Sequence, residues 1–181
     1  MQDEEILNQI KSRPRIGLAR QLARKLLKEA KIKGAPISMQ KIGEYMEQKY
    51  NLQLQGLKNF FSDKVSGLTV IIDETPTIGF NKDQSWYRRR FTIAHEIGHF
   101  MLNTAHYKQS GDSGDMQTID TANPIEKEAN AFAAELLMPL QQFKKDYRGS
   151  LRTLEGLSAK YQVSQHAAAL QLSNSGALAK V

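Results

Sequence analysis

Two histidines stand four positions apart in this chain, at His95 and His99, and Glu96 directly follows the first of them. In an α-helix, positions i and i+4 lie about 40° apart around the axis and one turn above each other, so both imidazoles can reach one ion. Glu96 projects to one side of the pair, where its carboxylate can take a proton from water. The spacing therefore predicts a helix that carries two metal ligands and a general base.

Apolar residues surround this histidine pair. A helix that is apolar on most sides is a buried helix, and buried imidazoles need polar partners. The competing interpretation is a histidine pair on a solvated face, with Glu96 as an ordinary surface residue. It does not account for the apolar residues around the pair. They are Phe91, Ile93, Ala94, Ile97, Phe100, Met101 and Leu102. We therefore predict a metal site, and the H-E-x-x-H pattern is typical of zinc peptidases.

Composition limits the kind of site and the number of domains. The 181 residues contain no cysteine, so a zinc site must use nitrogen and oxygen ligands. Residues 1–6 hold acidic side chains and no apolar run, so we expect a cytoplasmic protein without a membrane anchor. The best boundary candidate lies at Gly149, which divides a zincin-like metallopeptidase domain over residues 1–148 from a helical tail over residues 149–181.

Periodicity predicts a mostly helical chain with a short sheet. Apolar residues recur at helical spacing over residues 15–30, and a second helix is expected to begin at Ser38, a typical N-cap residue. Residues 68–72 and 77–81 form two strand-like runs joined by a turn, which predicts a hairpin. We therefore predict an α+β, zincin-like fold with a small antiparallel sheet before the active helix. An edge strand of this sheet would align an extended peptide, although most hairpins are only scaffold.

A further helix is expected to begin after Asn123, with Pro124 in its first turn, and to end before Pro139. The polar segment before it, residues 103–123, is long for a loop in a compact domain, and such loops are often functional. Because a catalytic zinc ion usually takes three protein ligands, this helix is the expected source of the third.

Glu126 and Glu128 compete for the position of third ligand. Two helical steps point these side chains about 160° apart, so both cannot face one metal. Glu126 also has an alternative role as the capping-box partner of Asn123. Asn130 favours Glu126, because it lies one turn later on the same face, where its side-chain carbonyl can accept a hydrogen bond from a ligating imidazole. We favour Glu126, and Glu128 remains the alternative.

The two segments that carry this chemistry are residues 90–99 (RFTIAHEIGH) and residues 126–139 (EKEANAFAAELLMP). In residue type, order and spacing they resemble the two signature blocks of the ImmA/IrrE family of bacterial and phage zinc metalloproteases. The resemblance covers about residues 35–173, and it implies Zn²⁺ as cofactor and cleavage of a helix-turn-helix repressor, which derepresses genes of a mobile element or a stress response. The residues that it assigns are the zinc ligands His95, His99 and Glu126 and the catalytic acid and base Glu96.

Residues 154–170 also resemble the short helix-turn-helix-like tail of such proteins, with Ser164 as the cap of the second helix. Only Gln165, His166 and Gln171 are candidates to read bases there, and phosphate contacts need more basic side chains than this helix has. We therefore expect a packing module rather than direct DNA binding. Many family members carry a separate DNA-binding domain for which this chain has no room, so the expected partner is a separate repressor protein.

Acyl transfer also requires an oxyanion stabiliser. His106, Tyr107 and Tyr87 are the candidates, and each also fits an ordinary loop or scaffold position. The competing class of function is a regulatory module that binds DNA or a repressor and uses zinc only structurally, although a structural site has no need of Glu96. Basic residues near the amino terminus favour that class, but an amphipathic helix explains them equally well. They are Lys11, Arg13, Arg15, Arg20, Arg24, Lys25, Lys28, Lys31 and Lys33.

Overall fold

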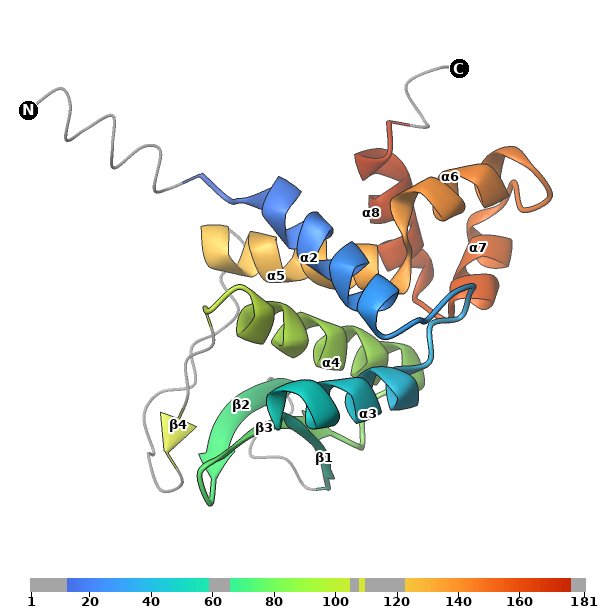
Figure 1. Ribbon diagram of the computed structural model, residues 1–181. Helices are drawn as coiled ribbons and strands as arrows, with labels where there is room; N and C mark the ends of the chain where they lie inside the picture. The colour runs from blue at the N-terminus through green and yellow to red at the C-terminus, as the bar shows by residue number, and fades with distance from the viewer. Residues whose placement is uncertain (1–12, 59–65, 105–107, 110–122, 177–181) are drawn as a thin grey trace, which may run out of the picture.

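The computed structural model describes residues 13–58, 66–104, 108–109 and 123–176. These residues form an α+β fold, as the sequence predicts (Figure 1). No helix in these ranges has the length and apolar character needed to cross a bilayer. The helices are α2 (Ile16–Glu29), α3 (Met39–Tyr50), α4 (Trp86–Met101), α5 (Pro124–Leu137), α6 (Leu140–Arg148), α7 (Leu154–Tyr161) and α8 (Gln165–Asn174), and the strands are β1 (Gln53–Leu57), β2 (Gly67–Ile72), β3 (Thr75–Asn81) and β4 (Lys108–Gln109).

Helices α3 and α5 begin at the capping residues that the sequence predicts. The Ser38 hydroxyl accepts a hydrogen bond from the Lys41 amide at the start of α3. The Asn123 side chain caps α5 in the same way by accepting from the Ile125 amide, and Pro124 occupies the first turn. Each cap satisfies an amide that has no partner within its own helix. The predicted starts of α3 and α5 are therefore confirmed.

The sheet is mixed, which corrects the prediction of a small antiparallel sheet. The strand order is β1-β3-β2-β4, and among the strands that the structure describes the β2–β3 hairpin is the one antiparallel pair. β1 runs parallel to β3, and β4, which follows the active helix in sequence, runs parallel to β2. The physical reason is that parallel pairing joins segments distant in the chain and leaves no turn signal. In addition, β1 contains two glutamines and a glycine rather than β-branched residues.

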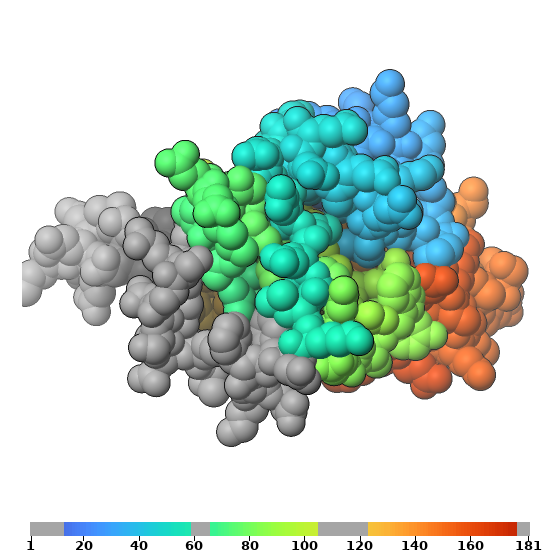
Figure 2. Space-filling view, turned by 90° about the horizontal axis from the view of Figure 1, so that it is seen from below, coloured from blue at the N-terminus to red at the C-terminus, as the bar shows by residue number. Residues whose placement is uncertain are grey.

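Helix α4 lies at the centre of the molecule. It packs against α5 on one side and against β2 and β3 on the other, while α2 lies across α5 (Figure 1). The core joins these layers through fully buried apolar side chains, among them Ala23 of α2, Ala94 and Ile97 of α4 and Phe132 of α5. Figure 2 shows the molecule from below the view of Figure 1, where α3 and the strands lie in front of the helical layers. Helix α4, which carries His95 and His99, is therefore packed between α5 and the sheet.

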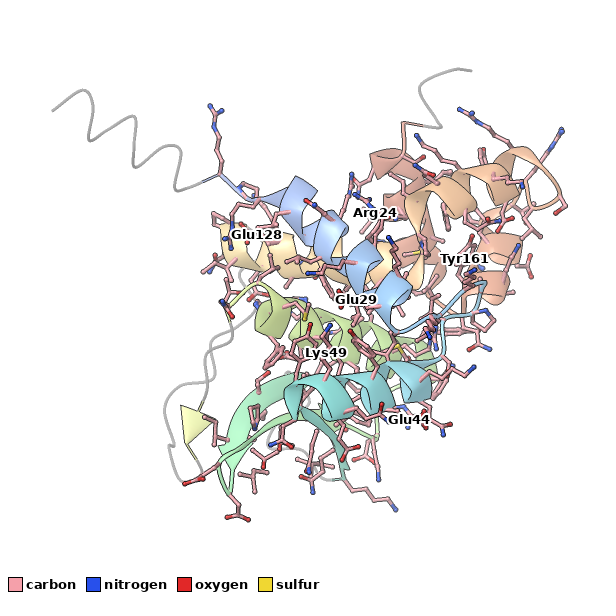
Figure 3. The ribbon with its side chains drawn as sticks, in the orientation of Figure 1. Arg24, Glu29, Glu44, Lys49, Glu128 and Tyr161 are labelled. Carbon is pink, nitrogen blue, oxygen red and sulfur yellow. The ribbon has the colours of Figure 1, made fainter. Side chains whose placement is uncertain are left out.

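Two ion pairs link the amino-terminal helix α2 to α5. The Arg15 guanidinium and its backbone amide both donate to Glu128, at 2.7 Å each. Arg24 Nη1 lies 3.1 Å from Glu135 Oε1, and Glu135 is almost completely buried. Figure 3 shows Arg24 and Glu128 on this α2–α5 boundary. Two members of the amino-terminal basic cluster therefore bind this chain's own carboxylates.

The carboxyl-terminal helices form a helix-turn-helix-like unit that packs on α4. Gln162 ends α7 with a left-handed φ of 52°, and the Ser164 side chain then caps α8. The buried Arg90 of α4 donates from Nε to the carbonyl of Gln162 and from Nη2 to that of Tyr161, at 3.1 and 3.5 Å. These bonds satisfy carbonyls at the end of α7. The domain boundary at Gly149 stays a prediction. Polar contacts such as the hydrogen bonds of Arg90 join the residues on its two sides.

Candidate metal centre

The helix α4 brings His95 and His99 together as the spacing predicts. The Ser85 hydroxyl caps this helix by accepting a hydrogen bond from the Arg88 amide. Both imidazoles are buried, with 8% of each residue exposed, and their Nε2 atoms lie 3.0 Å apart. Two ring nitrogens therefore share one small volume at the α4–α5 boundary.

Glu126 joins the two histidines, and Glu128 does not. Glu126 Oε2 lies 3.1 Å from His95 Nε2, and Oε1 lies 3.3 Å from His99 Nε2. Glu128 points to the other side of α5, where it binds Arg15. The capping-box role considered for Glu126 is not used, because its carboxylate faces the imidazoles while Asn123 caps the Ile125 amide. Geometry thus separates the two glutamates by their face of the helix.

Gly98 allows α5 to approach α4 closely enough for this contact. A Cβ at Gly98 would lie 3.1 Å from Phe132 Cβ and 3.2 Å from both Cα and O of Ala129. Two of these three atoms belong to the α5 backbone and cannot move independently of the helix. Glycine between the two histidines of the motif therefore shortens the distance over which Glu126 must reach.

Hydrogen bonds on the far side of each ring fix the tautomers. His95 Nδ1 lies 3.0 Å from Asn130 Oδ1, an oxygen that can only accept, so Nδ1 carries the proton and Nε2 presents a lone pair. His99 Nδ1 lies 3.1 Å from Thr104 Oγ1, whose own proton points to the His99 carbonyl. His99 Nε2 therefore also presents a lone pair. The Asn130 contact was predicted from the sequence, and the Thr104 contact was not.

Three lone-pair donors that converge in this way suit a divalent cation. A tetrahedral zinc ion with ligand bonds of about 2.0–2.1 Å places its ligand atoms roughly 3.3 Å apart, close to the 3.0, 3.1 and 3.3 Å found here. The Oε2 atom of Glu126 is also buried, and among the described residues it has no hydrogen-bond partner. His95, His99 and Glu126 thus form a group that fits a metal ion by donor type, spacing and burial.

The electrostatics of the group also favour a cation. Burial alone would lower the pKa of His95, but the adjacent Glu126 carboxylate and the charge of Glu96 outweigh it, and that pKa is raised. His95 and His99 hold the pKa of the Glu126 carboxyl far below its usual range. The site therefore carries a negative potential that a bound cation would neutralise.

Glu96 lies beside the ligand group on α4, where the sequence places it. It is partly exposed, and its Oε2 accepts a hydrogen bond of 3.0 Å from the Thr69 hydroxyl of β2. The strand β2 thus lies directly against the acidic residue of the motif. Together the four side chains provide a three-ligand metal position and an accessible carboxylate next to it, which is the set needed for metal-assisted hydrolysis.

Comparison with known proteins places this geometry in a family. A family model described as the IrrE N-terminal-like domain, a peptidase family, matches residues 53–173. The chain belongs to this IrrE-like family. The resemblance to ImmA/IrrE proteins predicted from the two signature segments is therefore confirmed.

A solved structure shows the same fold as this IrrE-like chain. It is a transcriptional regulator from Mycobacterium tuberculosis, with a TM-score of 0.60 and 16% sequence identity, and the match covers 86% of this chain and 46% of the regulator. The chain thus spans less than half the length of that protein. No curated protein matches the chain.

The predicted oxyanion stabilisers are not brought to the site of the IrrE-like chain by the described residues. His106 and Tyr107 lie outside the residues that the structure describes. Tyr87 is 42% exposed in the first turn of α4, and it lies eight positions before His95, about 12 Å along the helix axis. The role of Tyr87 as an oxyanion stabiliser stays a prediction.

Sequence reasoning missed Thr69, because no local pattern relates a strand residue to a helix residue 27 positions later.

Proposed function

We propose that this IrrE-like chain is a zinc-dependent endopeptidase. The observation that carries the proposal is the convergence of two imidazole lone pairs and the Glu126 carboxylate beside Glu96. A purely structural metal site needs four ligands and no neighbouring base, whereas a catalytic site keeps one position open. Among the described residues, only three metal-ligating side chains meet at this point.

The chain's own residues would perform the proton transfers of peptide hydrolysis. Zinc held by His95, His99 and Glu126 would polarise the scissile carbonyl and lower the pKa of water. Glu96 takes a proton from water as the water oxygen bonds to the carbonyl carbon. Glu96 then delivers that proton to the amide nitrogen as the carbon–nitrogen bond breaks, and the remaining water proton passes from the new carboxyl group to the amine, which yields a carboxylate and a protonated amine.

The proposed substrate is a helix-turn-helix transcriptional repressor, whose cleavage would derepress genes of a mobile element or a stress response. Two observations support a protein substrate bound in an extended form. The family resemblance implies a repressor protein as substrate, and the position of β2 beside Glu96 supports an extended bound form. We infer that an extended peptide binds beside β2 and pairs with its main chain by hydrogen bonds.

The direct test replaces Glu96 with Gln and incubates the purified protein with a candidate helix-turn-helix repressor that the wild-type protein cleaves. We expect Glu96→Gln to retain about one zinc ion per chain and to lose cleavage by at least 100-fold, because the ligands remain and the base is gone. Glu155→Gln, which changes an exposed glutamate of α7, is the matched control and should cleave normally. Undiminished cleavage by a zinc-loaded Glu96→Gln protein would exclude Glu96 as the base.

The alternative function is a regulatory module that binds DNA or a repressor and holds zinc structurally. The helix-turn-helix-like geometry of α7 and α8 is the observation in its favour, and Gln165 and His166 are exposed at the start of α8. Gln171, the third residue considered for base contacts, is 1% exposed and donates to the Met138 carbonyl instead. Mobility shifts at rising salt test this alternative: sequence-specific DNA binding that survives removal of metal would support it over the peptidase.

A further inference from the structure

The carboxylate of Glu96 has a single hydrogen-bond donor among the described side chains. The Thr69 hydroxyl donates to Glu96 Oε2 over 3.0 Å. Thr69 is 4% exposed, so water competes little for its hydroxyl, while Glu96 itself is partly exposed. The second oxygen, Oε1, has no donor within the described residues. The two oxygens of one carboxylate therefore differ in their surroundings.

The sheet holds Thr69 in a fixed position. Thr69 pairs with Ile78 in the antiparallel β2–β3 register, and Ile78 is fully buried in the core. A β-branched side chain in a strand has few accessible χ1 rotamers, which limits the directions in which the hydroxyl can point. The donor to Glu96 is thus a rigid group rather than a mobile surface side chain.

Gly67 allows β2 to lie close enough to α4 for this bond. A Cβ at Gly67 would lie 2.4 Å from Thr92 Cγ2 and 3.3 Å from Glu96 Cγ. Thr92 and Glu96 are four residues apart on α4 and face the same strand. Strand and helix are therefore in direct contact on the side of α4 that carries the carboxylate.

We propose that Thr69 is a positioning residue for Glu96. By fixing Oε2, the hydroxyl sets the plane of the carboxylate and leaves Oε1 as the oxygen that exchanges the proton with water and the leaving amine. The Thr69 side chain acts through Glu96 rather than on the substrate or the metal, whereas pairing of β2 with a bound peptide would use the main chain. The inference rests on the proposed peptidase function and adds to it a residue that lies outside the two signature segments.

The test uses three variants of the full chain. Thr69→Val removes the hydroxyl and keeps the shape of the side chain, while Thr69→Ser keeps the hydroxyl. Thr77→Val is the matched control: Thr77 is 2% exposed in β3 of the same sheet, and its hydroxyl donates to the Thr75 carbonyl rather than to Glu96. Each protein is measured for bound zinc, for melting temperature, and for kcat and KM on the repressor that the wild-type protein cleaves.

We expect Thr69→Val to lower kcat by about 10- to 100-fold, as loss of a supporting hydrogen bond beside a metal site typically does. KM and bound zinc should stay unchanged, Thr69→Ser should recover most of the rate, and Thr77→Val should match the wild type. In a Glu96→Gln background, adding Thr69→Val should cost nothing further, because the residue that it positions is already inactive. A normal kcat in Thr69→Val, or an equal loss in Thr69→Ser and Thr77→Val, would overturn the proposal.

A crystal structure of Thr69→Val separates this inference from the proposed function. We expect the Glu96 carboxylate to be rotated or disordered in the variant and ordered in the wild-type protein, with or without metal. An unchanged Glu96 conformation in Thr69→Val would overturn the positioning role even if the chain is a peptidase. Failure of the zinc-loaded wild-type protein to cleave the repressor would instead contradict the proposed function, while the structures would still decide the role of Thr69.

Discussion

Two glutamates one residue apart on either side of Lys127 have different surroundings. Glu126 faces the two imidazoles, whereas Glu128 accepts three hydrogen bonds from the Arg15 side chain and one from its amide. Burial raises the pKa of Glu128, but its bonds to Arg15 outweigh this effect and the pKa is lowered. One carboxylate is therefore available to a metal, and the other fastens α2 to α5.

Replacing each glutamate with Gln should separate these roles. Glu126→Gln should lose at least 10-fold in zinc affinity, because an amide is a poor zinc ligand. Glu128→Gln should bind zinc normally but lose about 1–3 kcal/mol of unfolding free energy, the cost of weakening a charged hydrogen bond. Zinc titration by calorimetry and urea unfolding measure the two effects. Equal zinc loss in both variants would contradict the separation.

At the scale of elements, the approach of α5 to α4 depends on Gly98. Gly98→Ala should weaken zinc binding, because a Cβ 3.2 Å from the Ala129 backbone forces the helices apart and withdraws Glu126 from the histidines. Alanine is otherwise the better helix former by about 1 kcal/mol, so the loss would not arise from α4 itself. Gly17→Ala is the control, since nothing lies within 4 Å of its added Cβ. It should bind zinc normally and be slightly more stable.

A second prediction concerns the junction between α6 and α7. Asp146 is buried there and accepts hydrogen bonds from Gln142, Tyr161 and Lys160; Figure 3 shows Tyr161 in the tail. Burial raises the pKa of Asp146, but the bonds from Lys160, Tyr161 and Gln142 outweigh this effect and lower it. Because the folded-state pKa lies below the unfolded value of about 3.9, the stabilisation is complete above that pH and is lost as pH falls through the folded pKa.

Asp146→Asn should therefore lose about 1–3 kcal/mol of unfolding free energy at pH 7. The difference from the wild type should shrink as the pH falls below about 4, where the wild-type carboxyl also takes up a proton. Urea unfolding from pH 7 to pH 3 measures both values. Asp73→Asn is the control: Asp73 is exposed with a φ of 47°, which asparagine tolerates well. A constant difference across this range would show that the charge of Asp146 is not the cause.

The sequence predicts elements with local signals and misses contacts between distant ones. Ser38 and Asn123 mark helix starts because a cap bonds an amide two or three residues away. Glu126 is separable from Glu128 because the helical period alone decides which face each occupies. Other features join segments 24 to 72 positions apart, and no local pattern encodes them. They are the parallel pairing of β1 with β3, the hydrogen bond from Thr69 to Glu96, and the hydrogen bond from Arg90 to the end of α7.

At the scale of the whole molecule, the ligands come from two helices that other contacts already hold together. α4 and α5 share a continuous apolar boundary, α2 is tied to α5 by two ion pairs, and the tail is tied to α4 through Arg90. A metal ion bound by His95, His99 and Glu126 would add one more link between α4 and α5. The fold should therefore persist without metal, and metal should raise its stability.

Removing metal with a chelator should lower the melting temperature without unfolding the protein at 25 °C. At a free zinc concentration of 100 times Kd, binding stabilises the folded state by about 2.7 kcal/mol. For a chain of this size each kcal/mol corresponds to about 2–4 °C, so the expected decrease is about 5–11 °C. Calorimetry measures the shift, and circular dichroism at 222 nm should show unchanged helix content. At that zinc concentration Glu126→Gln should not respond to the chelator if its affinity has fallen 1,000-fold. After a 10-fold loss it should still respond, with about half of the wild-type shift. Collapse of the helical signal on chelation would mean that metal, rather than apolar packing of α4 on α5, holds the two helices together.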